Sequence, residues 1–133
     1  MALKVEFLRE NRLIVTHVVG PFDLGEYIQF ARKVHAEYLD NATALIHGIL
    51  DFSQAQGFPN NVLSNALKIS KSKHRNSGLL IYVATNTVMR RFLEIFINLT
   101  KDPDQRFCRT YEDALAEVDA ALLTESTQKN RHT

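Results

Sequence analysis

GILDFSQAQGFPNNVL, residues Gly48 to Leu63, is the stretch that decides the fold. Its first residues complete an apolar run that begins at Ala44, and such runs are typical of parallel strands covered on both faces. Asp51 follows the run, and a polar loop then leads into a helix that we expect from about residue 61 to residue 73. In an α/β protein, ligands and partners usually bind at a junction of this kind.

The segments on both sides of this stretch alternate between strand and helix patterns. Residues 3–7 have the two-residue period of a half-buried strand, and residues 13–19 predict a second strand that forms a hairpin with it. Further strands are expected over residues 79–84 and 106–109, and further helices over residues 24–40, 87–100 and 111–122. The order β-β-α-β-α-β-α-β-α predicts an α/β fold with a mixed, mostly parallel sheet of about five strands and about four helices.

Length and composition limit the kind of protein. The chain has 133 residues, 45% of them hydrophobic, and a formal net charge of +1. We expect one domain over residues 1–123 and a flexible polar tail over residues 124–133. The small net charge gives no general attraction for nucleic acid or acidic membranes, and no apolar run is long enough for an integral membrane segment. The single cysteine, Cys108, favours a reduced, cytoplasmic setting.

Four local patterns occur in a characteristic order. They are the strand Leu13–Val19 followed by Gly20-Pro21-Phe22-Asp23, the strand end Ile49-Leu50-Asp51, the strand Leu79–Ala84, and the closing Thr110-Tyr111-Glu112-Asp113-Ala114-Leu115. Over roughly residues 3 to 123, these patterns and the predicted element order resemble the STAS family, the SpoIIAA-like domain of bacterial anti-sigma-factor antagonists. The resemblance implies a non-catalytic regulatory or protein-interaction domain of a bacterial protein. A branch of this fold family is compared with Sec14-type lipid carriers, so binding of a small lipid or another apolar ligand is the alternative.

The resemblance also implies a phosphorylation switch, and this chain departs from it. In the members that carry the switch, a Ser or Thr follows an Asp at the start of the helix after the third strand. Asn60 and Asn61 occupy the corresponding places here. Because an amide cannot accept a phosphate, we expect the family's phosphoacceptor to be missing. Ser53 and Ser64 flank the segment but do not match the motif position.

Polar residues gather where two neighbouring parallel strands are predicted to end. The carboxyl ends of parallel strands meet at one edge of a sheet, so we expect these residues to form a binding edge for a partner or ligand. A structural role stays open for each of them, because Asp caps turns through its own backbone and Asn caps helices. The candidate residues are Asp51, Ser53, Asn60, Asn61, Thr85 and Asn86.

The predicted helix Val88–Leu99 has an unusually broad apolar surface. Its apolar arc covers about 200°, against the roughly 100° that a surface helix needs. Either the helix is buried between its neighbours, or the additional surface binds a second subunit, another partner or an acyl chain. We expect a homodimer through the edge formed by Met89, Leu93 and Ile97.

Signals for catalysis, metals and cofactors are weak. The chain has no Gly-rich phosphate loop, and its five histidines do not have metal-ligand spacing. An acid–base pair would need a His or Arg beside Asp51, and the sequence alone does not place one there. We therefore expect no enzyme activity, no metal or cofactor site and no nucleic-acid partner.

Overall fold

The computed structural model describes residues 1–57 and 74–131, with side chains through Thr127. Its five strands form one sheet in sequence order. The first two strands pair antiparallel and all other neighbours pair parallel, so the predicted mixed, mostly parallel sheet is confirmed. The strands are β1 (Ala2–Leu8), β2 (Leu13–Gly20), β3 (Ile46–Ala55), β4 (Ser77–Val83) and β5 (Gln105–Cys108).

Three α-helices are present in the described part of the chain: α1 (Leu24–Val34), α3 (Thr87–Thr100) and α4 (Tyr111–Arg131). A π-helical turn, η1 (His35–Leu39), extends α1. Asp23 caps α1 by accepting a hydrogen bond from the backbone N–H of Glu26 at 3.0 Å. The predicted helix over residues 61–73 lies outside the described residues.

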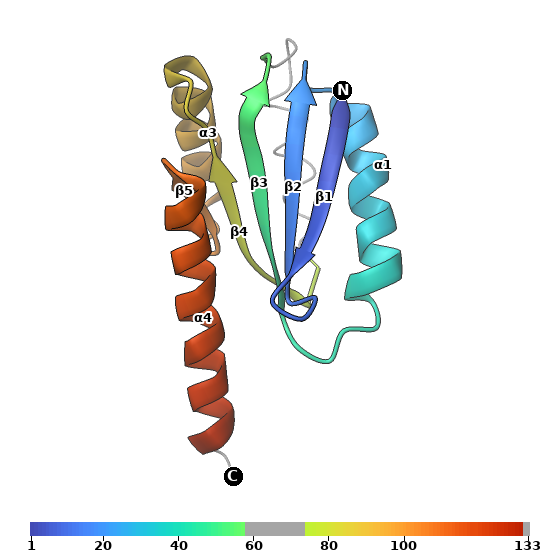
Figure 1. Ribbon diagram of the computed structural model, residues 1–133, viewed down its shortest axis with the longest axis vertical. Coiled ribbons are helices and arrows are strands. Elements are labelled where there is room, and N and C mark those ends of the chain that lie inside the picture. The colour runs from blue at the N-terminus through green and yellow to red at the C-terminus, as the bar shows by residue number, and fades with distance from the viewer. Residues whose placement is uncertain (58–73, 132–133) are drawn as a thin grey trace.

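The sheet separates two apolar cores, because alternate residues of a strand face opposite sides. On one side, Leu50 and Tyr82 pack with α3. On the other side, Ile49 and Ile81 pack against α4. Figure 1 shows α1 toward the β1 end of the sheet and α3 toward the β5 end.

Strand β3 is longer than the sequence predicts. It continues past Asp51 to Ala55 and stays paired with β2 up to the contact between Gly20 and Ala55. Phe52, which is only 3% exposed, gives this extension an apolar anchor in the core. Asp51 therefore lies within a strand, and the expectation that the strand ends at this acid is wrong.

The hairpin turn between β1 and β2 is tied to the last helix. Arg9 binds Asp119 at 2.7 Å, and Arg12 forms an ion pair with Glu125. The residues after Leu123, which were expected to form a polar tail, continue α4 to Arg131. None of the described helices combines the length and the apolar character that a membrane span requires.

Candidate functional site

A histidine lies between two carboxylates on the face of the sheet that α4 covers. The Nδ1 atom of His17 is 2.8 Å from Asp51, and its Nε2 atom is 3.2 Å from Glu6. These residues belong to three adjacent strands, and the ring of Tyr111, the first residue of α4, lies 6.0 Å from the imidazole ring. We call these four residues the His17 cluster.

The geometry of the His17 cluster sets its charge. An ionised carboxylate only accepts hydrogen bonds, so both contacts of the ring are satisfied when both ring nitrogens carry a proton. Partial burial acts to lower the pKa of His17, but the hydrogen bonds to Asp51 and Glu6 outweigh it and the pKa is raised. The two carboxylates therefore favour the protonated form of the His17 ring.

The His17 cluster does not resemble a metal site. The two carboxylates bind opposite nitrogens of the ring, so the three groups do not converge on one point. Among the described residues, no group of three or more His, Cys, Asp or Glu side chains is arranged to hold a metal ion. The second oxygen of Asp51 accepts a hydrogen bond from the backbone N–H of Ser53 at 2.9 Å. Asp51 thus accepts a hydrogen bond from the nearby backbone through one oxygen and contacts His17 through the other.

The members of the predicted binding edge that the structure describes do not assemble as a single site. Asp51 is two residues after Ile49 on the face toward α4, whereas Asn86 starts α3 on the opposite face. Asn86 is occupied as a helix cap, because its side-chain oxygen accepts hydrogen bonds from Val88 and Met89 at 2.9 and 3.2 Å. Ser53 and Thr85 are exposed. Asn60 and Asn61 lie outside the described residues.

The expected edge of α3 also needs correction. Met89 and Leu93 are buried in the core, and Ile97 is half-buried against it. A partner cannot reach the first two in the folded chain, so these residues do not form a docking surface. The helix instead has two apolar faces, one packed on the sheet and one exposed. The exposed face, which we call the α3 stripe, consists of Val88, Ile95 and Leu99 with the half-buried Phe92.

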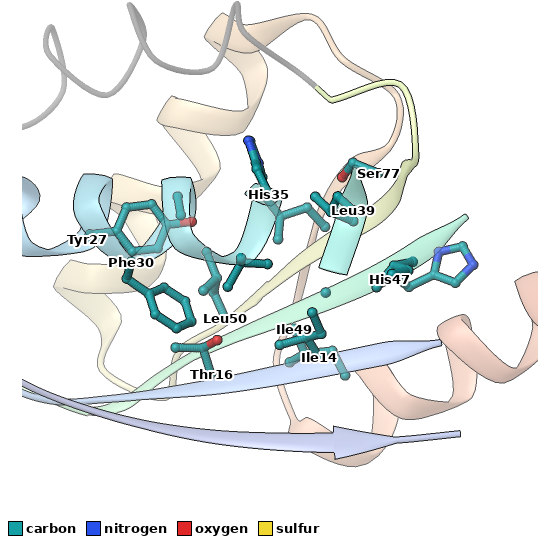
Figure 2. Close-up of a pocket in the computed structure, with 15 residues that line it drawn as sticks. Ile14, Thr16, Tyr27, Phe30, His35, Leu39, His47, Ile49, Leu50 and Ser77 are labelled. Carbon is teal, nitrogen blue, oxygen red and sulfur yellow. The ribbon is translucent and has the colours of Figure 1, made fainter. Parts of the chain in front are cut away.

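A small pocket lies between α1 and the sheet. It has a volume of about 110 Å³ and is mostly apolar. In Figure 2, the rings of Tyr27 and Phe30 on α1 face Thr16 and Leu50 on the strands. No residue of α1 is fully buried, which agrees with loose packing beneath this helix. No pattern in the sequence indicates this pocket, because a cavity depends on how far α1 lies from the sheet.

Three solved structures are similar to this chain over most of its length. A DUF3478-family protein from Shewanella loihica PV-4, described as having a SpoIIAA-like fold, has a TM-score of 0.61 at 15% identity, with 86% of this chain and 90% of that chain covered. The anti-sigma factor antagonist SpoIIAA in its unphosphorylated form has a TM-score of 0.60 at 17% identity, with 89% of this chain and 98% of that chain covered. An anti-sigma factor antagonist from Mycobacterium paratuberculosis has a TM-score of 0.58 at 17% identity, with 89% of this chain and 95% of that chain covered.

The fold is SpoIIAA-like. No protein-family model and no curated protein matches the chain, so the resemblance lies in the three-dimensional arrangement. It agrees with the resemblance inferred from the sequence patterns. In this SpoIIAA-like fold, the segment compared with the family's phosphoacceptor motif, residues 58–63, lies outside the described residues. The absence of a phosphoacceptor therefore stays a prediction that depends on the two asparagines in the sequence.

Proposed function

We propose that this chain is a non-catalytic, STAS-like regulatory domain that works by docking another protein molecule. The observation that carries the proposal is the exposed α3 stripe. Proteins of the same fold that are described as anti-sigma factor antagonists support a role that depends on protein partners. At these identities the likeness concerns the fold, so the surface itself has to carry the functional argument.

The α3 stripe is a continuous apolar line. Its residues are spaced four, three and four positions apart, which keeps them on one side of a helix. Val88 is 77% exposed, Ile95 52% and Leu99 50%. A row of large aliphatic side chains in contact with water is unfavourable, and such patches mark interaction surfaces. We infer that another apolar surface covers this row in the functional state.

A second copy of the chain fits the α3 stripe. The spacing of the stripe is symmetric about its midpoint, so two antiparallel helices place Val88 opposite Leu99 and Phe92 opposite Ile95 of the second copy. Beside the stripe, Arg91 and Glu94 are exposed, and neither forms an ion pair with a described residue. The same pairing brings Arg91 close to Glu94 of the second copy, on both sides of the two-fold axis.

The His17 cluster supports a structural role better than a catalytic one. The pair of His17 and Asp51 lies on the α4 side of the sheet, and the pocket beneath α1 lies on the opposite side. Burial raises the pKa of the Cys108 thiol to about 11, so this sulfur is protonated and is a poor nucleophile. The pocket beneath α1 therefore does not adjoin this acid–base pair, and the Cys108 thiol is not a reactive group that the pair could activate.

The alternative function, a lipid carrier, is less well supported by the size and position of the pocket. Pockets for drug-sized ligands have volumes of roughly 300–1,000 Å³. The pocket beneath α1 has about 110 Å³, and α1 rather than α3 covers it. An acyl chain does not fit into this volume.

Solution molar mass tests the docking proposal. Fourteen residues span about 21 Å of helix, so the interface is small and we expect association at concentrations of about 0.1 mM and above. Light scattering should show a dimer for the native chain and a monomer for Ile95→Glu. Leu123→Glu is the matched control, because Leu123 is exposed on α4 and lies outside the stripe. A native chain that stays monomeric at every concentration, or a Leu123→Glu variant that dissociates equally, contradicts the proposal.

A further inference from the structure

Strand β1 forms one edge of the sheet. Every residue from Ala2 to Leu8 has a partner on β2, and Figure 1 shows β1 at the end of the row of strands. In the part of the chain that the structure describes, no backbone hydrogen bond reaches the other side of β1. A row of unpaired N–H and carbonyl groups on an edge strand is a template for pairing with a further strand.

The backbone groups of β1 that face away from β2 belong to its odd-numbered residues. The backbone N–H of His47 on β3 donates to the carbonyl of Arg12 at 2.8 Å, so Arg12 and every second residue after it direct their backbone groups toward β3. The residues between them face β1 instead, and one of these, Val15, pairs with Glu6. The even-numbered residues of β1 therefore bond to β2. The outward-facing N–H and carbonyl groups belong to Leu3, Val5 and Phe7.

The sequence of β1 is self-complementary about Val5. If two copies of β1 pair antiparallel with Val5 opposite Val5, Leu3 lies opposite Phe7 of the second copy. The backbone groups of these residues all face outward, so each of these facing pairs exchanges both of its hydrogen bonds. The same pairing places Lys4 opposite Glu6 of the second copy, in the class of pair whose side chains lie closest together.

The two charged residues select this register. Lys4 is exposed and forms no ion pair with a described residue. The side chain of Glu6 is 55% exposed and contacts His17 through one oxygen. A shift of the pairing by two residues in either direction would place Lys4 opposite Lys4 or Glu6 opposite Glu6, and like charges in facing positions are destabilising. A lysine on an edge strand usually opposes pairing, but in the register centred on Val5 each Lys4 meets an acid.

The other face of β1 presents apolar side chains. Phe7 is 40% exposed, and its ring lies 4.9 Å from that of Tyr38, which is also exposed. Leu3 is partly buried against the core on this face. In the register centred on Val5, Leu3 of the second copy lies beside Phe7 and removes part of its apolar surface from water.

We propose that β1 pairs antiparallel with β1 of a second copy, centred on Val5, so that the two sheets become one. A single added strand buries less than the roughly 1,200 Å² of a stable interface, so we expect this association only above about 1 mM. Strand β1 and helix α3 lie toward opposite ends of the sheet (Figure 1), so the inference goes beyond the proposed docking function. Dimers formed through α3 would join into a row through β1.

Disulfide trapping tests the pairing and its register. Lys4→Cys and Glu6→Cys are made separately in the Ile95→Glu background, so that the α3 stripe cannot bring the chains together. In the proposed pair, residue 4 faces residue 6 of the second copy with Cα atoms about 4.5 Å apart, within the range of about 4.4–6.8 Å that a disulfide spans. An equimolar mixture treated with oxidised glutathione should therefore give a linked heterodimer. Labelling one variant with nitrogen-15 identifies the heterodimer by its intact mass.

Each variant alone is the matched control. Two copies of the same variant place their introduced cysteines diagonally, with Cα atoms about 7–8 Å apart, which is too far for a disulfide. The native Cys108 is buried. We expect at least about tenfold more linked dimer from the mixture than from either variant alone. The absence of linked dimer in the mixture, or equal yields in all three samples, overturns the proposal. Light scattering of the native chain and Ile95→Glu reports on the α3 stripe separately, so the two failures are distinguishable.

Charge reversal tests the complementarity of the edge. In Ile95→Glu we expect the amide NMR signals of Leu3, Val5 and Phe7 to shift with protein concentration up to about 2 mM. Adding Lys4→Glu places acids opposite each other and should reduce these shifts at least about threefold. Combining Lys4→Glu with Glu6→Lys restores opposite charges and should restore the shifts. Lys33→Glu is the control, because Lys33 is exposed on α1. Signals that do not depend on concentration, or a double variant that behaves like Lys4→Glu, overturn the proposal.

Discussion

The imidazole of His17 donates to a carboxylate oxygen of Asp51 across 2.8 Å, although 34 residues separate the two positions in the chain. The parallel register of β2 and β3 pairs these two residues directly. Glu6 on β1 binds the other ring nitrogen, so the imidazole links three adjacent strands. A contact of this kind stabilises the sheet most when the ring carries its positive charge.

Replacing Asp51 should lower the pKa of His17. Partial burial already acts against the charged ring, and the hydrogen bond to Asp51 is the largest influence that opposes it. In Asp51→Asn the carboxylate charge is lost, and we expect the pKa of His17 to fall below that of the native protein. An NMR titration of the His17 ring measures this value. Glu6→Gln, which changes the more exposed carboxylate, should lower it less. If the pKa of His17 were equal in the native chain and in both variants, the two carboxylates would not be what stabilises the protonated ring.

Stability should depend on pH through the same residue. The folded-state pKa of His17 is raised above its ordinary value of about 6.5, so its stabilising contribution is complete below that pH. The contribution is lost as the pH rises through the folded-state pKa. The difference in free energy of unfolding between the native chain and His17→Gln should therefore be larger at about pH 5.5 than at about pH 9. Urea denaturation at the two pH values measures it, and a difference that grows with pH contradicts the prediction.

Gly78→Ala should destabilise the fold through His47. A Cβ atom at position 78 would lie 2.4 Å from Nδ1 of His47, which is too close for any side chain. That ring is 2% exposed and is fixed by the backbone N–H of Leu79, which donates to Nδ1 at 2.8 Å. Crowding of this kind costs about 1–3 kcal/mol.

A double-mutant cycle identifies the cause of that loss. In a His47→Ala background the ring is absent, so Gly78→Ala should cost much less than it does in the native chain. Both free energies of unfolding come from urea denaturation. An equal cost in the two backgrounds would attribute the effect to the backbone of β4 and not to the ring.

Glu125→Gln should loosen the end of α4. Glu125 binds His47 at 2.9 Å and also forms an ion pair with Arg12, so one carboxylate holds two partners. Hydrogen bonds to charged groups contribute about 1.5–3 kcal/mol to the free energy of unfolding. Because Glu125 is partly exposed, we expect Glu125→Gln to lower this free energy by about 1–2 kcal/mol. Hydrogen exchange of the α4 amides should accelerate. Glu117→Gln is the control, because Glu117 makes only an exposed contact of 3.5 Å with Arg106. Exposed ion pairs contribute about 0–1 kcal/mol to the free energy of unfolding, and we expect less than about 0.5 kcal/mol here.

Two alanine substitutions should separate the faces of α3. Leu93 is 2% exposed in the core, and Leu93→Ala should lower the free energy of unfolding by about 2–4 kcal/mol. Val88, on the exposed stripe, should contribute less than about 0.5 kcal/mol in dilute solution. Urea denaturation of both variants measures the difference. A similar loss for both would mean that the stripe is covered even in the monomer.

Most of the fold could be predicted because its strands are covered on both faces. Strands of that kind produce continuous apolar runs, and the runs before Asp51 and around Ile81 identify β3 and β4 directly. The end of β3 was mispredicted because an acid usually ends a buried strand. Here the contact with His17 gives Asp51 a hydrogen-bond partner, and Phe52 continues the core beyond it.

The candidate site was harder to predict, because it depends on relationships between elements. His17 and Asp51 are visible as polar residues in two buried strands, and a buried polar residue needs a partner. The register that joins them is set by the packing of whole strands and not by local sequence. For α3, apolar residues surround most of the helix, so sequence periodicity could not decide which side meets the sheet. The contact of Leu93 with the core settles that question.

The ion pairs at the hairpin turn have a consequence for the order of folding during synthesis. Arg9 and Arg12 find their partners 110 and 113 residues later in the chain. The hairpin therefore leaves the ribosome long before Asp119 and Glu125 are translated. Its turn cannot form these two contacts until α4 has been synthesised. Contacts of such long sequence separation slow folding, because a large loop has to close before they form. The last helix therefore fixes the hairpin turn only late in synthesis. A chain that stops before Glu125 would lack the contacts of this residue with Arg12 and His47.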